Sequence, residues 1–370
     1  MHENWPLVWL YLTSCLFSSS IARSSAPKRE IFLAAPRSAR FRCFLQFVVA
    51  ITLLFSGSWA AAADAVWYLP PAASSVGQTG WLPQPLRKLS GTIESFQQGK
   101  LQIVVADASS VEGLARRELD DDRIVWIQVD WSGEGAEVQQ AFEDFNNRQF
   151  AACLKPMGEY VKRAKPRWRQ LIAYGYLMNA AAAVDKHSAA LAIAAGFHAA
   201  APPSCFYSLL PIAWTRPPIN AARDQAAVAG LQHADPAVRV IAASWLLTGT
   251  NRQRADAVLA RASNDPTDPL LARLADAVRW RTAAGPEIAA SLATWERKVD
   301  QLPIAVQAGP MAAIADRLQA SGRGEEALAW WLSVAELGKQ PGELADEAAA
   351  KARQLMETMA EQAAADQSNK

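Results

Sequence analysis

The chain has 370 residues, of which 51% are hydrophobic and 20% are charged, so it can build a sizeable core and is excluded from the disordered class. Its formal net charge is +1, but residues 1–63 carry six basic side chains against two acidic ones, which leaves −3 on the remainder. A mildly acidic body disfavours nucleic acid as a partner.

An uncharged apolar segment begins at Phe44, directly after Arg40 and Arg42, and runs into alanines that end at Ala63. A basic flank, an apolar stretch and small residues are the layout of a signal peptide, so we predict cleavage near Ala63. The alternative is an uncleaved anchor over residues 44–63, about 20 residues and just long enough to span a bilayer. Both interpretations treat residues 1–63 as a leader and predict an exported body, periplasmic or extracellular, that meets a membrane only through this segment.

Prolines and glycines interrupt residues 64–87 without any periodicity, which predicts an extended linker. Residues 88–132 then show strand patterns at 92–96, 101–106 and 123–131. In strand number and size this small β unit resembles the SH3-like and Sm-like barrels. Three short strands cannot form a stable unit alone, so we expect this one to rest on the helices that follow.

Helical periodicity begins after Gly133. Apolar residues recur at three- and four-residue steps in four runs, at 138–145, 150–161, 168–178 and 190–197. Pro156 lies inside the second run and should bend that helix. Successive amphipathic helices that cannot bury their faces singly are typical of stacked hairpins, so we predict a helical repeat domain over residues 133–362 and a disordered tail over 363–370.

The clearest hairpin lies near the C-terminus, where small and large residues alternate in the order Ala315, Leu318, Gly322, Ala327 and Trp331, with Pro341 closing it. This pattern resembles the tetratricopeptide repeat, whose two helices approach each other through small residues flanked by aromatic ones. Two earlier hairpins match it in part, the first through Ala141, Phe145, Phe150 and Cys153, the second through Gly175, Ala189 or Ala190, and Pro202. The matching patches cover about a third of the chain.

Three dipeptides in the middle of the chain mark helix starts, namely Asp235-Pro236, Asp268-Pro269 and Gly285-Pro286. An aspartate N-cap accepts hydrogen bonds from free N–H groups, and proline suits the first helical position. The first of these, followed by Ile241, Ala242, Trp245 and Leu246, resembles the second helix of a HEAT-type repeat. The fold class predicted is therefore mainly α, an α-solenoid of helical hairpins with a small N-terminal β unit.

The search for catalytic chemistry finds three histidines after the leader, His187, His198 and His233, without ligand spacing, and none of the common catalytic motifs. We therefore expect no enzymatic activity, cofactor or metal. His198, among alanines, is expected to be partly buried and hydrogen-bonded. The acidic run at residues 120–122 is interpreted as a solvated turn before a strand, with a hard-cation site as the alternative.

Two cysteines, Cys153 and Cys205, remain after the leader. In an oxidising compartment they could form a disulfide that joins the first two hairpins. The alternative is a buried Cys153 and a separate free Cys205.

The chain contains fourteen tryptophans, most of which fall on apolar helix stripes and are expected in the core. Trp280 and Trp330 fall off these stripes, so we predict that they form an exposed aromatic patch for a partner. The leading hypothesis is an exported, non-enzymatic scaffold that binds a protein or peptide partner in the cell envelope. The alternatives are a glycan- or peptide-binding module that uses surface tryptophans and, third, an unrecognised hydrolase.

Overall fold

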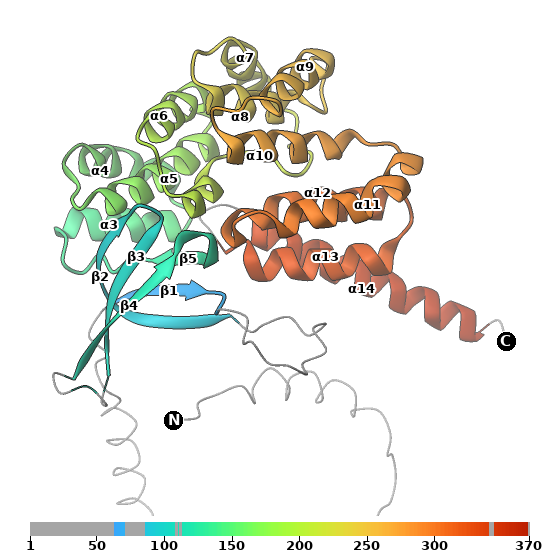
Figure 1. Ribbon diagram of the computed structural model, residues 1–370. Coiled ribbons are helices and arrows are strands. Elements are labelled where there is room, and N and C mark those ends of the chain that lie inside the picture. Colours follow the sequence, from blue (N-terminus) through green and yellow to red (C-terminus); the bar gives the residue numbers. More distant parts are fainter. Residues whose placement is uncertain (1–62, 71–85, 108–109, 111–112, 340–343, 369–370) are drawn as a thin grey trace, which may run out of the picture. The chain divides into compact units, whose positions relative to one another are not determined.

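The computed structural model describes residues 63–70, 86–107, 110, 113–339 and 344–368, all of which belong to the unit formed by residues 60–370. Within this part the protein is mainly helical, with twelve α-helices and one five-stranded sheet (Figure 1). The predicted signal peptide and anchor lie outside the described residues except for Ala63. Among the residues described, none of the helices combines the length and hydropathy required to cross a bilayer.

The sheet is antiparallel, with strand order β4-β3-β2-β1-β5. The strands are β1 (Asp64–Tyr68), β2 (Arg87–Gln97), β3 (Lys100–Ala106), β4 (Leu114–Asp120) and β5 (Ile124–Gln128). Two of them differ from the expectation, because β1 comes from the predicted linker and β4 was not predicted as a strand. The sheet is open, with β4 and β5 at its edges, which differs from a closed barrel.

The carboxylate of Asp64 connects the sheet to the helices. It is 2% exposed and accepts hydrogen bonds from the backbone N–H groups of Ile93 (3.2 Å) and Asp130 (2.9 Å). The guanidinium of Arg169, on a helix, lies 3.3 Å from the same carboxylate and also donates to the carbonyl of Asp130. A buried carboxylate needs such partners, so the start of β1 and this helix are fixed to each other. This agrees with a β unit that rests on the helices.

The four helices predicted from periodicity are confirmed as α3 (Ala136–Asn146), α4 (Phe150–Arg163), α5 (Arg167–Ala183) and α6 (His187–Ala199). Pro156 lies inside α4, as expected. The small residue of the second hairpin has a different neighbour from the one expected. A Cβ at Gly175 would lie 2.7 Å from the side chain of Leu209 in the short 3₁₀ helix η2 (Ser204–Leu209), so Gly175 lets η2, rather than Ala189 or Ala190, approach α5.

The later helices are α7 (Ala221–Gly230), α8 (Pro236–Leu246), α9 (Arg252–Ala262), α10 (Pro269–Arg279), α11 (Gly285–Asp300), α12 (Ile304–Ala320), α13 (Gly324–Leu337) and α14 (Leu344–Ser368). The predicted capping residues are confirmed: Asp235 accepts from the N–H groups of Ala237 and Val238, and Asp268 accepts from that of Leu271. Residues 363–368 continue α14 instead of forming a disordered tail, because their alanines favour helix.

The C-terminal hairpin is formed by α12 and α13. Ala315, Leu318, Ala327 and Trp331 are all fully buried in one cluster, and the indole N–H of Trp331 donates to the side chain of Gln319 at 3.1 Å. This hairpin confirms the helices and the buried residues predicted for it.

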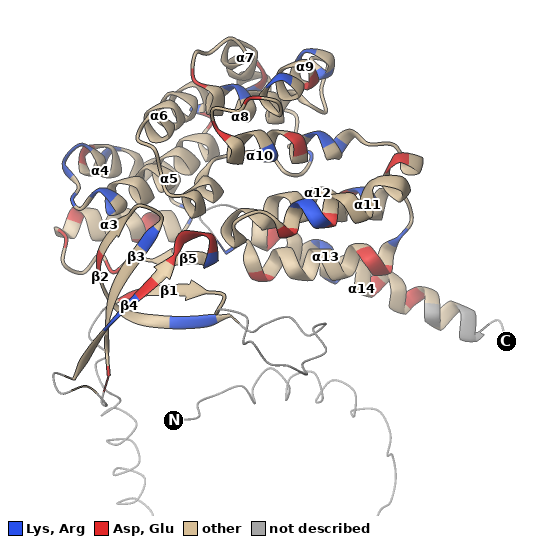
Figure 2. Cartoon of the chain, viewed as in Figure 1, with Lys and Arg blue, Asp and Glu red and all other residues tan. Residues whose placement is uncertain are grey.

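Both charge signs occur on α9 and α10 (Figure 2), and ion pairs join neighbouring helices, such as Arg279 with Asp256 at 2.9 Å.

Candidate functional site

A proline-rich loop of residues 210–220 runs between η2 and α7 and forms the centre of the site. Pro211, Pro217 and Pro218 keep it out of regular structure. Helix α8 anchors its first half, because the indole N–H of Trp245 donates to the carbonyl of Pro211 (2.9 Å) and the hydroxyl oxygen of Ser244 accepts from the N–H of Ala213 (3.0 Å).

A buried arginine also fixes this loop. Arg281 follows α10 in the 3₁₀ turn η3 (Trp280–Thr282) and is 4% exposed. Its guanidinium donates to three backbone carbonyls, those of Ala213 (2.7 Å), Ser244 (2.8 Å) and Thr215 (2.6 Å). Burial lowers the pKa of Arg281 to about 10. The hydrogen bonds to the three carbonyls compensate for this desolvation and fix the conformation of the loop. We call this arrangement the Arg281 clamp.

The loop then meets the C-terminal helices. A Cβ on Gly309 in α12 would lie 2.1 Å from the indole ring of Trp214, so only glycine lets the ring pack against the helix. The hydroxyl of Thr215 donates to the carboxylate of Glu347 in α14 at 2.9 Å. The loop therefore connects three parts of the unit: α8, η3 and the α12–α14 layer.

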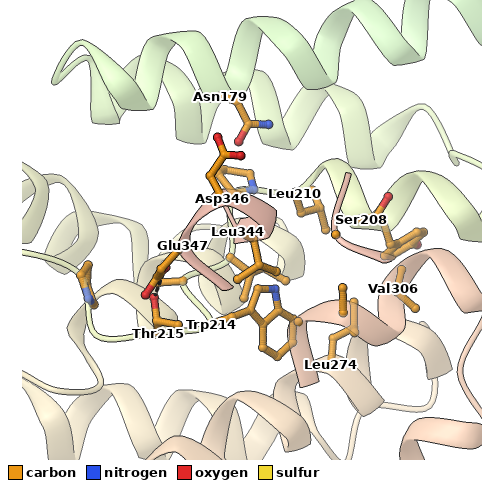
Figure 3. A pocket seen from close by; sticks show the side chains of 18 of the residues that line it. Asn179, Ser208, Leu210, Trp214, Thr215, Leu274, Val306, Leu344, Asp346 and Glu347 are labelled. Carbon is orange, nitrogen blue, oxygen red and sulfur yellow. Dashed lines mark hydrogen bonds between the residues drawn. The ribbon is translucent and has the colours of Figure 1, made fainter. Parts of the chain in front are cut away.

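The first cleft lies between this loop and helices α5, α10, α12 and α14, with a volume of about 650 Å³. In Figure 3 Leu210, Trp214, Leu274, Val306 and Leu344 form its apolar side, and Asn179, Asp346 and Glu347 form its polar side. The amide nitrogen of Asn179 donates to the carbonyls of Gly175 (2.9 Å) and Leu209 (3.1 Å), which fixes that side chain.

A second cleft of about 710 Å³ adjoins the first along the loop. Loop residues 211–213, 217 and 218 line both clefts, as do Arg148, Asn179 and Asp346. The two clefts are therefore adjacent parts of one groove along the loop. Aromatic residues from β5, α3, α4, α5 and α8 line the second cleft, namely Trp126, Phe145, Phe150, Tyr176 and Trp245.

The polar wall of the second cleft comes from the start of α6 and the start of α7. Arg223 is 8% exposed, and its guanidinium donates to the neighbouring carboxylate of Asp224 at 3.0 Å. His187 is 6% exposed; its Nε2 lies 3.2 Å from Asp185, and its ring packs edge-on against Trp245. Burial lowers the pKa of His187 more than the nearby Asp185 raises it, so the ring is neutral at neutral pH.

A second histidine forms a separate structural cluster. His198 at the end of α6 places Nδ1 2.8 Å from Asp235 and Nε2 3.1 Å from Asp268, the N-cap residues of α8 and α10. The hydroxyl of Tyr207 also donates to Asp268, at 2.6 Å. Hydrogen bonds to Asp235 and then to Asp268 raise the pKa of His198 to about 9, so the imidazolium donates from both nitrogens. We call this cluster the His198 clasp; it confirms the expected partly buried, hydrogen-bonded histidine.

The aromatic patch predicted from Trp280 and Trp330 does not form as expected. Trp280 is 5% exposed and stacks on Trp295, with ring centroids 5.2 Å apart. It lies in η3, beyond the end of α10, so the projection of that helix does not apply to it. Trp330 is partly buried and packs against the C-terminal core.

The two cysteines are separate free thiols and both are buried, so the disulfide that the sequence left open does not form and the alternative holds. Cys153 belongs to the core of α3–α5, and Cys205 to the larger core around η2. Burial raises the pKa of Cys153 to about 11.

The acidic run forms the expected turn before a strand, because the 3₁₀ turn η1 (Asp121–Arg123) precedes β5 and Asp120 and Asp122 are exposed. Asp121 is partly buried. It accepts a hydrogen bond from the N–H of Ser204 at 2.8 Å, the first residue of η2, and thereby holds the sheet to the start of that turn.

Arg223, His187 and Arg281 are site residues that were not predicted from the sequence. For Arg223 a signal existed, because it stands on the same helical stripe as Ala226, Ala227 and Gly230, where an apolar residue is expected. For Arg281 no local pattern distinguishes it from a surface arginine.

Comparisons with protein-family models, with curated proteins and with solved structures find no match for this chain.

Proposed function

We propose that the protein is an exported, non-enzymatic α-solenoid scaffold of tetratricopeptide- and HEAT-like hairpins that binds an extended peptide segment of an envelope partner. The observation that carries the proposal is the groove formed by the two adjoining clefts along the 210–220 loop. Each cleft is within the size range of ligand-binding sites, and together they suit a chain of several residues.

The lining of the groove supports a peptide ligand. Apolar side chains such as Leu210, Trp214 and Val306 would accept side chains of the ligand, while Asn179, Asp346 and Glu347 would bond to its backbone or polar groups. The Arg281 clamp fixes the wall in advance, which lowers the entropic cost of binding.

A glycan-binding module is the second candidate, because aromatic rings line the second cleft. Trp126 stacks on Trp67 with centroids 4.0 Å apart, and Trp126 and Tyr176 are partly exposed there. Aromatic faces of this kind are one way to hold a sugar ring.

The test is retention of ligand libraries by the immobilised full chain. A random hexapeptide library and a mixture of cell-wall oligosaccharides would be applied separately. Retention of peptides supports the proposal; retention of oligosaccharides alone overturns it in favour of the glycan module.

A matched pair of variants locates the binding site. Ala183→Trp places a large ring in the second cleft at an exposed position and should abolish retention. Ala329→Trp makes the same change at an exposed position of α13, outside the lining of both clefts, and should leave retention unchanged. Equal retention by both variants would show that the groove is not the site.

A further inference from the structure

Unpartnered buried polar atoms gather in the wall of the second cleft. Among the described residues, buried side-chain nitrogen or oxygen atoms without a hydrogen-bond partner occur in Trp126, Trp168, His187, Ser204, Arg223 and Arg317. Three of these residues, Trp126, His187 and Arg223, line this one cleft. Each such atom costs about 1–3 kcal/mol, so a cluster of them requires an explanation.

Arg223 is the cationic member of this wall. Its backbone N–H is capped by the side chain of Asn220, and its guanidinium donates to Asp224 through one terminal nitrogen, while its Nε has no partner. A guanidinium carries five N–H donors in a fixed fork, so Arg223 retains donors for a planar acceptor such as a carboxylate.

His187 supplies the complementary group. Its Nε2 lies 3.2 Å from Asp185, but both ring nitrogens are buried and neither has a hydrogen-bond partner. In the neutral ring one of the two nitrogens is an acceptor. Trp245 packs against the ring and holds it in place. In this wall Arg223 therefore offers hydrogen-bond donors and His187 offers an acceptor, and neither residue has all of its hydrogen bonds satisfied.

The charges of the wall favour a ligand with a single negative charge. Asp185 and Asp224 lie beside Arg223 and His187, so a dianion such as a phosphate monoester would meet two like charges. A carboxylate carries a single negative charge and so meets less repulsion from these two aspartates than a dianion does.

Building on the proposed function, we infer that the second cleft binds the C-terminal residue of the peptide. Its carboxylate pairs with the guanidinium of Arg223, and its backbone N–H donates to the unprotonated ring nitrogen of His187. The remainder of the peptide extends along the 210–220 loop into the first cleft.

The experiment applies three hexapeptide libraries to the immobilised full chain: free-acid peptides without Asp or Glu, the same peptides with amidated C-termini, and amidated peptides that contain Asp and Glu. We expect the free-acid library to be retained about tenfold more strongly than either amidated library, which is the effect of one charge-assisted hydrogen bond. This comparison needs no variant and so does not depend on whether a variant folds.

The outcomes separate the two proposals. Equal retention of free-acid and amidated peptides would overturn the C-terminal inference and leave peptide binding intact. Strong retention of amidated peptides with Asp and Glu would assign the carboxylate to a side chain and also overturn it. No retention of any library would overturn both proposals.

Variants then assign the effect to Arg223. Arg223→Met should remove the preference for free-acid peptides, and Arg223→Lys should keep part of it. Arg254→Met, at an exposed position of α9 outside the lining of both clefts, should leave the preference unchanged. A preference that survives Arg223→Met would overturn the assignment.

Discussion

Two buried arginines next to the 210–220 loop differ in how their hydrogen bonds are satisfied. Arg281 is 4% exposed and donates to three backbone carbonyls, whereas Arg223 is 8% exposed and leaves its Nε unpartnered. The two histidines repeat this contrast, because both ring nitrogens of His198 are bonded to carboxylates and neither ring nitrogen of His187 has a hydrogen-bond partner. Burial alone does not separate a structural group from a binding group; the number of satisfied donors and acceptors does.

The largest effect is expected from Arg281→Met. The change leaves three carbonyls without their donor, and removing one side of a buried charged interaction costs about 3–5 kcal/mol of unfolding free energy. Urea unfolding monitored by circular dichroism measures this loss. Arg216→Met, at an exposed position, should change stability by less than about 0.5 kcal/mol. A loss below about 1 kcal/mol for Arg281→Met would contradict the clamp.

Gly309→Ala tests how tightly the loop is seated on α12. The added Cβ would lie 2.1 Å from the ring of Trp214, so the ring or the helix must move, at a cost of about 1–3 kcal/mol. Thermal unfolding measures the loss of stability, and the fluorescence of Trp214 should change with it. Gly196→Ala, where a Cβ meets nothing within 4 Å, is the control and should be neutral or slightly stabilising. Equal stability of the two variants would show that Trp214 does not pack as described.

The His198 clasp predicts a dependence of stability on pH. Its pKa is raised from the ordinary 6.5 to about 9, so its contribution is fully present below pH 6.5 and is lost as pH rises through about 9. Because the side chain is 17% exposed, we expect on the order of 1–2 kcal/mol. The measurement is urea unfolding at pH 6 and pH 10 for the native chain and His198→Gln. The prediction fails if the difference in stability between them is the same at both pH values.

The smallest effect is expected from Arg223→Met. A desolvated guanidinium that is only partly hydrogen-bonded stabilises the fold little, and replacing it with an apolar side chain of similar length removes the cost of burial. We expect a change within about 1 kcal/mol in either direction, measured by the same urea titration as for Arg281→Met. A loss as large as that of Arg281→Met would mean that Arg223 is a structural residue, and the contrast between the two arginines would disappear.

The features predicted correctly from the sequence are those that depend on near neighbours in the chain. Asp235 and Asp268 were identified as helix caps because the bonds that they accept come from N–H groups two or three residues away. The α12–α13 hairpin was found for the same reason, since the helical spacing of Ala315 and Ala327 indicates which faces are buried.

The features that the sequence did not reveal depend on contacts between distant segments. Strand β1 was assigned to a linker because the prolines after it dominate the local composition, although β-branched and aromatic residues are present in Val66, Trp67 and Tyr68. Trp280 was assigned to the surface from a helical projection that ends one residue before it. The partners of Arg281 lie 37 to 68 residues away, beyond the reach of any local pattern.

We expect the two halves of the His198 clasp to form one after the other as the chain is synthesised. Asp235 lies 37 residues after His198, and Asp268 lies 70 residues after it. The shorter loop costs less entropy to close, and Asp235 leaves the ribosome first. The start of α8 can therefore be fixed to the end of α6 through Nδ1 while α10 is still being made. Asp268 can bond to Nε2 only after it has left the ribosome. The two helices would therefore bond to the same imidazolium in the order in which they are made.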